Sequence, residues 1–235
     1  MTRPRRAAAP GPQSFGEGPI SIRTRFEKFP ASVKGAFVIR GEDRDPHQVV
    51  LVEARVARFP GGQGRAIGVE PVVIQVAPHL DVFVPFEFAL ADLDSGWYEL
   101  AASIELDGSP RVMTGDRRFV VAWPRGAVHR GKTAVDATVA LPGGASVEVE
   151  RVDCEATSTV VHFRVDPPGP VAVRVGSAEG DLPVLDTEVD PDSGKGRVTA
   201  YPVMAGQPSV TLEFRPAGEG GKARGAGDTV EVPLR

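Results

Sequence analysis

Apolar and polar residues alternate along most of the chain, which is the pattern of β-strands that bury one face. In residues 80–90 every even position is apolar, whereas Asp81 and Glu87, at odd positions, are charged. The alternation in residues 97–106 predicts another such strand, with Tyr98 and the even positions after it facing the core. Each of these stretches therefore predicts a strand of a half-buried sheet.

Residues 48–59 predict a further strand of the first half, with Glu53 and Arg55 on its solvent side. The residues expected on its buried face are Val50, Val52, Ala54 and Val56. In the second half the pattern returns in four stretches, residues 157–165, 170–175, 209–214 and 229–234.

Turn-forming sequences separate these stretches. Segments such as "LDGSP", "LPGGA" and "DPDSGKG" combine glycine, which accepts positive φ, with proline, which fixes φ near −65°. No stretch of about twelve residues has the periodicity of an amphipathic helix. The sequence therefore predicts an all-β protein.

About fifteen short strands are too many for one small sandwich and suit two in tandem. We expect a disordered tail over residues 1–17, a first β-sandwich over 18–123, a linker over 124–132 and a second β-sandwich over 133–235. The glycine-rich residues 217–228 are expected to form a mobile hairpin loop before the last strand.

The segment "LADLDSGWYEL", residues 90–100, resembles the corner between strands E and F of immunoglobulin-like domains. Leu90, Asp94, Gly96 and Tyr98 occupy the family pattern L-x-x-x-D-x-G-x-Y-x-C, and Leu100 stands where the family has a cysteine. The resemblance implies that the Tyr98 ring is buried and that its hydroxyl bonds to the backbone upstream. It predicts an immunoglobulin-like first domain without the usual disulfide. The second half has no such motif and its sandwich is predicted from the alternation alone, so that we expect two tandem immunoglobulin-like β-sandwich domains.

Composition and charge narrow the classes of function. The net charge of −4 offers no basic field for nucleic acid, and no apolar run reaches the roughly 20 residues of a membrane span. A single cysteine excludes an internal disulfide and is typical of a reducing compartment. We therefore expect a cytoplasmic protein.

The string "GAVHRGKT", residues 126–133, fits the phosphate-binding loop pattern G-x-x-x-x-G-K-[ST]. Such a loop needs a helix directly after it, whereas "AVDATVALPGG" alternates like a strand and ends in Pro142 and two glycines. We therefore interpret the string as linker and expect no nucleotide site.

Catalytic candidates are weak. The four histidines, His47, His79, His129 and His162, and the lone Cys154 form no zinc-ligand spacing. A Cys154–His162 pair assembled in space stays an alternative, although His162 is predicted to face outward and a lone cysteine is more commonly a small buried residue. No cofactor and no catalytic residue is predicted.

Two acidic loops are candidate ligand sites. Asp186, Asp190 and Asp192 lie in "LDTEVDPDSGKG" and could hold Ca²⁺, but the segment lacks the spacing of an EF-hand. The other loop, "EDRDPHQ", contains Asp43, Asp45 and His47 as candidate metal ligands, although its Asp-Pro is also ordinary turn chemistry.

Trp97 is the most informative candidate, because an inward Tyr98 forces its neighbour to the opposite face of the sheet. There a large aromatic packs on its surroundings, such as the Arg118 stem, or anchors a partner. Our leading hypothesis is a non-enzymatic interaction or scaffold protein. It would bind a protein partner through the sheet face around Trp97, Glu99 and Arg118 or through exposed edge strands, with homo-oligomers possible. The alternative is an accessory module that binds carbohydrate or Ca²⁺ at the acidic loops.

Overall fold

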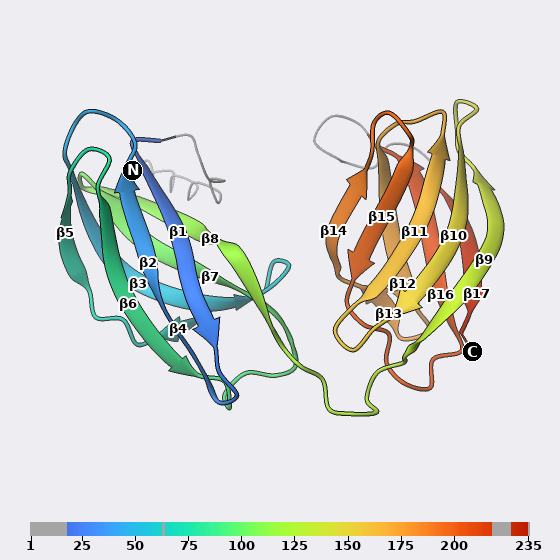
Figure 1. Ribbon diagram of the computed structural model, residues 1–235, viewed down its shortest axis with the longest axis horizontal. Helices are drawn as coiled ribbons and strands as arrows, with labels where there is room; N and C mark the ends of the chain where they lie inside the picture. The colour runs from blue at the N-terminus through green and yellow to red at the C-terminus, as the bar shows by residue number, and fades with distance from the viewer. Residues whose placement is uncertain (1–17, 63, 218–226, 235) are drawn as a thin grey trace, which may run out of the picture. The chain divides into compact units, whose positions relative to one another are not determined.

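The computed structural model describes residues 18–62, 64–217 and 227–234, and these contain β-strands and no helix (Figure 1). The strands form four antiparallel sheets, as the alternation predicted. The chain divides into two compact units, residues 1–121 and 122–235, each built from two sheets. The predicted N-terminal tail and most of the glycine-rich loop predicted at 217–228 lie outside the described residues.

The first unit contains eight strands in two layers (Figure 1). One sheet has the order β1-β2-β6, with strands β1 (Ile20–Lys28), β2 (Ser32–Gly41) and β6 (Asp81–Ala89). The other has the order β4-β3-β7-β8, and β5 also pairs with β3. Its strands are β3 (His47–Arg58), β4 (Gly64–Ile67), β5 (Val72–Val76), β7 (Gly96–Leu106) and β8 (Ser109–Val121).

The inward faces of these two sheets build one apolar core. The even positions of β7 from Tyr98 to Leu106 are all buried, as predicted. On β6 the predicted face is confirmed at Val84 and Phe86, whereas Leu80 precedes the strand and is exposed. Burial of this continuous apolar surface is the main force that holds the sheets together.

The predicted buried face of β3 is wrong in its first half. A β-bulge lies between Leu51 and Glu53, so that two residues of β3 occupy the space of one on β7. Val49 and Leu51 are buried before the bulge, and Val52 is exposed at it. After the bulge Ala54 and Val56 point inward, as expected. A bulge adds one residue, so the inward positions shift from odd to even residue numbers along β3. A prediction that assumes strict alternation therefore assigns the wrong face on one side of the bulge.

The corner before β7 is confirmed in the form that its motif implied. The buried Tyr98 donates a hydrogen bond from its hydroxyl to the backbone carbonyl of Asp94, at 2.9 Å. Its ring stacks on Phe119 of β8 with the centroids 5.6 Å apart. Leu100, at the position of the family's cysteine, is fully buried and supplies apolar packing.

The second unit contains nine strands. One sheet has the order β14-β15-β11-β10-β9, formed by β9 (Gly131–Ala140), β10 (Ser146–Cys154), β11 (Thr159–Asp166), β14 (Val184–Val189) and β15 (Lys195–Ala200). The other has the order β13-β12-β16-β17, formed by β12 (Val171–Ser177), β13 (Gly180–Leu182), β16 (Ser209–Pro216) and β17 (Asp228–Pro233). Both layers contribute to a single core rich in valine.

Phe163 packs closely on Gly196 in that core. The two residues are direct partners in the register of β11 and β15, and the Phe163 ring is almost completely buried. A Cβ atom at Gly196 would lie 2.2 Å from Cε2 of the ring. The ring therefore occupies the space that any side chain at Gly196 would need.

We predict that Gly196→Ala destabilises the second unit by about 1–3 kcal/mol, because the methyl group overpacks the core. Gly176→Ala is the matched control, since the nearest atom to its Cβ is 3.7 Å away. Urea unfolding of both variants measures the difference. Equal stabilities for the two variants would contradict the close packing of Phe163 on Gly196.

Candidate functional site

The three residues predicted to bind a partner lie on one face of the first unit. Trp97 and Glu99 alternate with the buried Tyr98 and Leu100 along β7, so they point away from the core. Arg118 of β8 is the direct partner of Glu99 in the register. Trp97 and Glu99 are partly buried and Arg118 is exposed. We call this side of the β4-β3-β7-β8 sheet, including the paired β5, the outer face.

Phe59 completes the aromatic end of the outer face. It follows β3, and its backbone N–H donates to the carbonyl of Trp97 at 2.8 Å. The guanidinium carbon of Arg118 lies 3.4 Å from the centroid of the Phe59 ring, which is a close cation–π contact. Sequence reasoning placed Phe59 at the end of the alternating stretch 48–59 but did not select it as a candidate. What distinguishes it is the contact with Arg118, a residue far away in the sequence.

Glu99 is held where its charge is unfavourable. Burial raises the pKa of its carboxyl above the ordinary value of 4.5, and the nearby positive charge of Arg118 offsets only part of the effect. A carboxyl whose pKa rises on folding favours the folded state when protonated and opposes it when ionised. At neutral pH the ionised Glu99 therefore reduces the stability of the first unit.

Three exposed valines extend the outer face beyond this end. Val112 of β8 is paired with Ser103 of β7, and Val52 lies at the bulge of β3 opposite the same residue. Val73 of β5 is paired with Val50 of β3. The exposed fractions are 43% for Val52, 60% for Val73 and 48% for Val112. The outer face therefore exposes apolar β-branched side chains on three of its strands.

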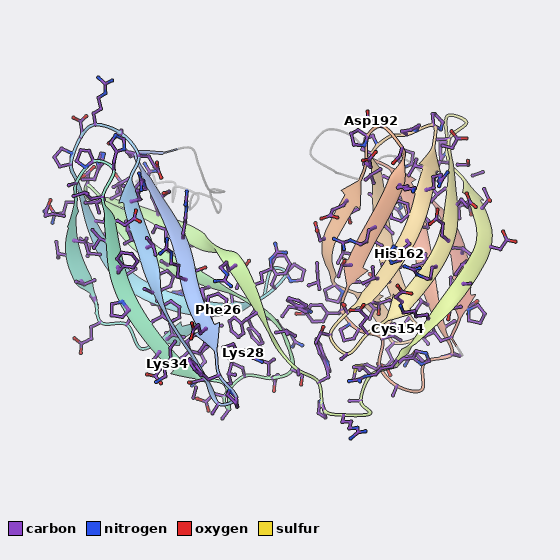
Figure 2. All side chains as sticks on the ribbon, viewed as in Figure 1. Phe26, Lys28, Lys34, Cys154, His162 and Asp192 are labelled. Atoms are coloured by element: carbon purple, nitrogen blue, oxygen red, sulfur yellow. The ribbon has the colours of Figure 1, made fainter. Side chains whose placement is uncertain are left out.

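The structure does not gather the predicted calcium ligands. Asp190 and Asp192 lie in the turn between β14 and β15, at one end of the second unit, and Asp186 lies within β14 (Figure 2). One carboxyl oxygen of Asp190 accepts hydrogen bonds from the backbone N–H of Asp192 and from the N–H and hydroxyl of Ser193. These bonds lower the pKa of Asp190, the one from the Ser193 backbone most strongly. Its carboxylate thus stabilises the turn.

No group of three or more His, Cys, Asp or Glu side chains is arranged to hold a metal ion within residues 18–62, 64–217 and 227–234. The set Asp186, Asp190 and Asp192 is therefore not brought together as a cation site. The acidic residues of this loop were predicted from their proximity in sequence alone.

The phosphate-loop string adopts no phosphate-loop structure. Gly131 begins strand β9, so Lys132 and Thr133 are extended where a nucleotide site requires a helix. Before them, the buried Val128 forms an isolated bridge with Met204, and the N–H of His129 donates to the carbonyl of Val203. This part of the predicted linker is held against the second unit.

Cys154 and His162 do not form a catalytic pair. Cys154 belongs to the core of the second unit, and burial raises the pKa of its thiol. His162 lies between the buried Val161 and Phe163 and points to the opposite side of the sheet, 3.3 Å from Asp153 (Figure 2). The arrangement offers no activated thiolate.

No known family model matches the sequence, and no curated protein matches it. Among solved structures the chain is similar to a conserved domain protein from Bacillus anthracis, with 10% identity, coverage of 94% of this chain and 88% of that one, and a TM-score of 0.30. It is also similar to the exo-chitosanase CsxA from Amycolatopsis orientalis, with 12% identity, coverage of 85% and 25%, and a TM-score of 0.18. Scores this low support no argument about this chain.

Within residues 18–62, 64–217 and 227–234, no helix is long and apolar enough to cross a bilayer.

We predict that Glu99→Gln raises the melting temperature at pH 7, because it removes a carboxylate whose ionisation opposes folding. The gain should disappear as the pH falls below about 4.5, where the native carboxyl is protonated as well. Thermal unfolding of both proteins across this pH range measures the effect. Lower stability of the variant at pH 7 would contradict the unfavourable burial of the charge.

We predict that Ca²⁺ at about 1 mM, enough for weak extracellular-type sites, leaves the melting temperature unchanged. Asp190→Ala should lower the melting temperature by the same amount with and without calcium, because the lost bonds are internal to the turn. A calcium-dependent increase that Asp190→Ala abolishes would restore the calcium hypothesis.

Proposed function

We propose that this chain is a non-enzymatic interaction or scaffold protein that binds a protein partner through the outer face of its first unit. The observation that carries the proposal is the exposure of Val52, Val73 and Val112 on one sheet surface. Water contact with a group of apolar side chains is unfavourable, and a partner that covers them gains the hydrophobic free energy.

The aromatic end of the face has the composition of a binding hot spot. Tryptophan and arginine are among the residues that contribute most to measured interfaces. Here Trp97 lies beside Phe59, whose ring is covered by the Arg118 guanidinium. The contact with Phe59 orients the arginine before binding, so less side-chain entropy is lost when a partner docks.

Glu99 supports the same assignment. Its partly buried carboxylate lowers the stability of the folded unit. Ionisable groups with shifted pKa values that reduce stability are concentrated at functional sites. A partner that brings a cation beside Glu99 would offset the unfavourable burial of its charge. The aromatic end of the face thus combines Trp97 and Phe59 with the carboxylate of Glu99 and the guanidinium of Arg118.

We further infer that the first unit is a disulfide-free member of the immunoglobulin-like sandwiches. The corner at Tyr98 and the buried Leu100 in place of a cysteine support this inference. The fold hosts many functions and does not itself identify a partner. The chemistry of the outer face carries the proposal.

The decisive experiment compares the wild-type chain with the double variant Val52→Ser, Val112→Ser as baits in a cell extract. Both positions are exposed, so the substitutions should leave folding intact. Loss of about 1 kcal/mol of apolar burial at each position should weaken binding of the recovered partner roughly 30-fold. Titration of the purified partner measures this change.

Leu80→Ser is the matched control, because Leu80 is 61% exposed and lies outside the outer face. It should bind like the wild type. If the double variant binds its partner as tightly as the control does, the outer face is not the binding surface. Recovery of the chain itself, lost in the double variant, would identify a second copy as the partner.

A further inference from the structure

The imidazole of His47, at the start of β3, lies between carboxylates from two different loops. Its Nδ1 is 2.7 Å from Oδ2 of Asp107, in the turn between β7 and β8. Its Nε2 is 2.9 Å from each carboxyl oxygen of Asp43, in the loop between β2 and β3. The side chain is only 11% exposed. One ring therefore connects two loops of the first unit.

Only one charge state of the ring satisfies both contacts. A carboxylate accepts hydrogen bonds, so each ring nitrogen must carry a proton to bind its partner. The imidazolium has both N–H groups, whereas the neutral ring has one and presents a lone pair at the other nitrogen. When His47 loses its proton, one of the two carboxylates faces a repulsive lone pair.

We propose that His47 is a pH-sensitive latch, which holds the loop of residues 42–46 closed when it is charged and releases the Asp43 side of that loop when it is neutral. This device is independent of the partner surface on the outer face, and it acts on loops joined to β3 and β7.

The remaining hydrogen bonds decide which contact breaks. Asp107 is fixed independently of the ring, because its Oδ1 accepts from the N–H of Gln48 and its own N–H donates to the carbonyl of Gln48, both at 2.9 Å. The carboxylate of Asp43 accepts one further bond, at 3.2 Å, from the N–H of Asp45 in the same loop. The neutral ring thus keeps its proton on Nδ1 toward Asp107, and Asp43 leaves.

Apart from the contact of Asp43 with His47, the loop is anchored at its first residue. The N–H of Glu42 donates to the carbonyl of Pro19 at 2.8 Å, and the Glu42 carboxylate accepts a bond from the Ser21 hydroxyl. These contacts do not involve His47, so they persist when it is neutral. The movement is therefore confined to residues 43–46.

The surrounding charges set the direction of the pH response. Hydrogen bonds to Asp107 first and Asp43 second raise the pKa of His47 above 6.5, against a smaller lowering by burial. The bond to His47 lowers the pKa of Asp107, and the charge of Arg111 on β8 acts in the same direction. On β5 the residue paired with His47 is the uncharged Val76. Asp43, Asp107 and Arg111 are the charged groups that act here.

The sign of the response follows from these directions. A histidine whose pKa is raised by folding contributes stability that is complete below about pH 6.5 and is lost as the pH rises through the folded pKa. A carboxyl whose pKa is lowered contributes stability that is lost as the pH falls below about 4. The latch is therefore closed at pH 6.5 and opens as the pH rises through the raised pKa of His47.

Nitrogen-15 NMR of the full chain tests the latch, because it reports the protonation state of each histidine nitrogen. We expect His47 to titrate with a midpoint above 6.5 and the neutral ring to carry its proton on Nδ1. The backbone amides of Arg44 and Asp45 should shift with the same midpoint. The amides of Gln48 and Asp107 should keep their hydrogen-exchange protection on both sides of it.

Asp43→Asn separates the latch from a merely structural histidine. It should lower the His47 midpoint toward 6.5 and abolish the coupled shift at Arg44 and Asp45. Asp92→Asn, at an exposed carboxylate paired with Arg65 elsewhere in the first unit, is the control and should leave the midpoint unchanged. The proposal would be overturned by a His47 midpoint at or below 6.5 in the wild type or by a neutral ring protonated on Nε2. It would also be overturned if the amides of Arg44 and Asp45 did not shift as His47 titrates.

Discussion

The burial of one face of every strand is the constraint on which the first unit depends. Two sheets share a single apolar core, so each strand must direct alternate residues inward and leave the others outside. Once Tyr98 is fixed inward by its ring contact with Phe119 and its hydroxyl bond to Asp94, Trp97 and Glu99 are forced outward. The position of the candidate partner residues is thus a consequence of core packing.

Regular alternation is what the sequence could reveal. The all-β class, the inward Tyr98 and the outward Trp97 follow from a period of two and one corner motif, and the structure has all three. No residue type marks the bulge at Val52 in the sequence. The predicted inward positions of Val50 and Val52 were therefore wrong. The same bulge leaves Val52 exposed on the outer face. Irregularity in the strand therefore created part of the surface proposed to bind a partner.

Contacts between distant segments could not be predicted. The Arg118–Phe59 contact joins β8 to the end of β3, and the His47–Asp107 contact joins the start of β3 to the turn after β7. Such pairs depend on strand register, which one sequence specifies only through the packing of the whole unit. A short motif is informative only together with the backbone around it. The phosphate-loop string has the residues of such a loop, but Lys132 and Thr133 lie in a strand, as the alternation after them indicated. The acidic loop is a tight turn that Asp190 stabilises with its own hydrogen bonds.

The charges of Glu99 and His47 have opposite effects on the stability of the first unit. The ionised Glu99 opposes folding, because burial removes water from its charge and Arg118 compensates only in part. The charged His47 favours folding, because two carboxylates surround it. Protonation therefore acts in the same direction at both sites and stabilises the first unit as the pH falls. The pKa shift is upward from the carboxyl range at Glu99 and upward from the neutral range at His47. Only the response at His47 changes the hydrogen bonding of a loop, because the neutral ring has one N–H donor for two carboxylates.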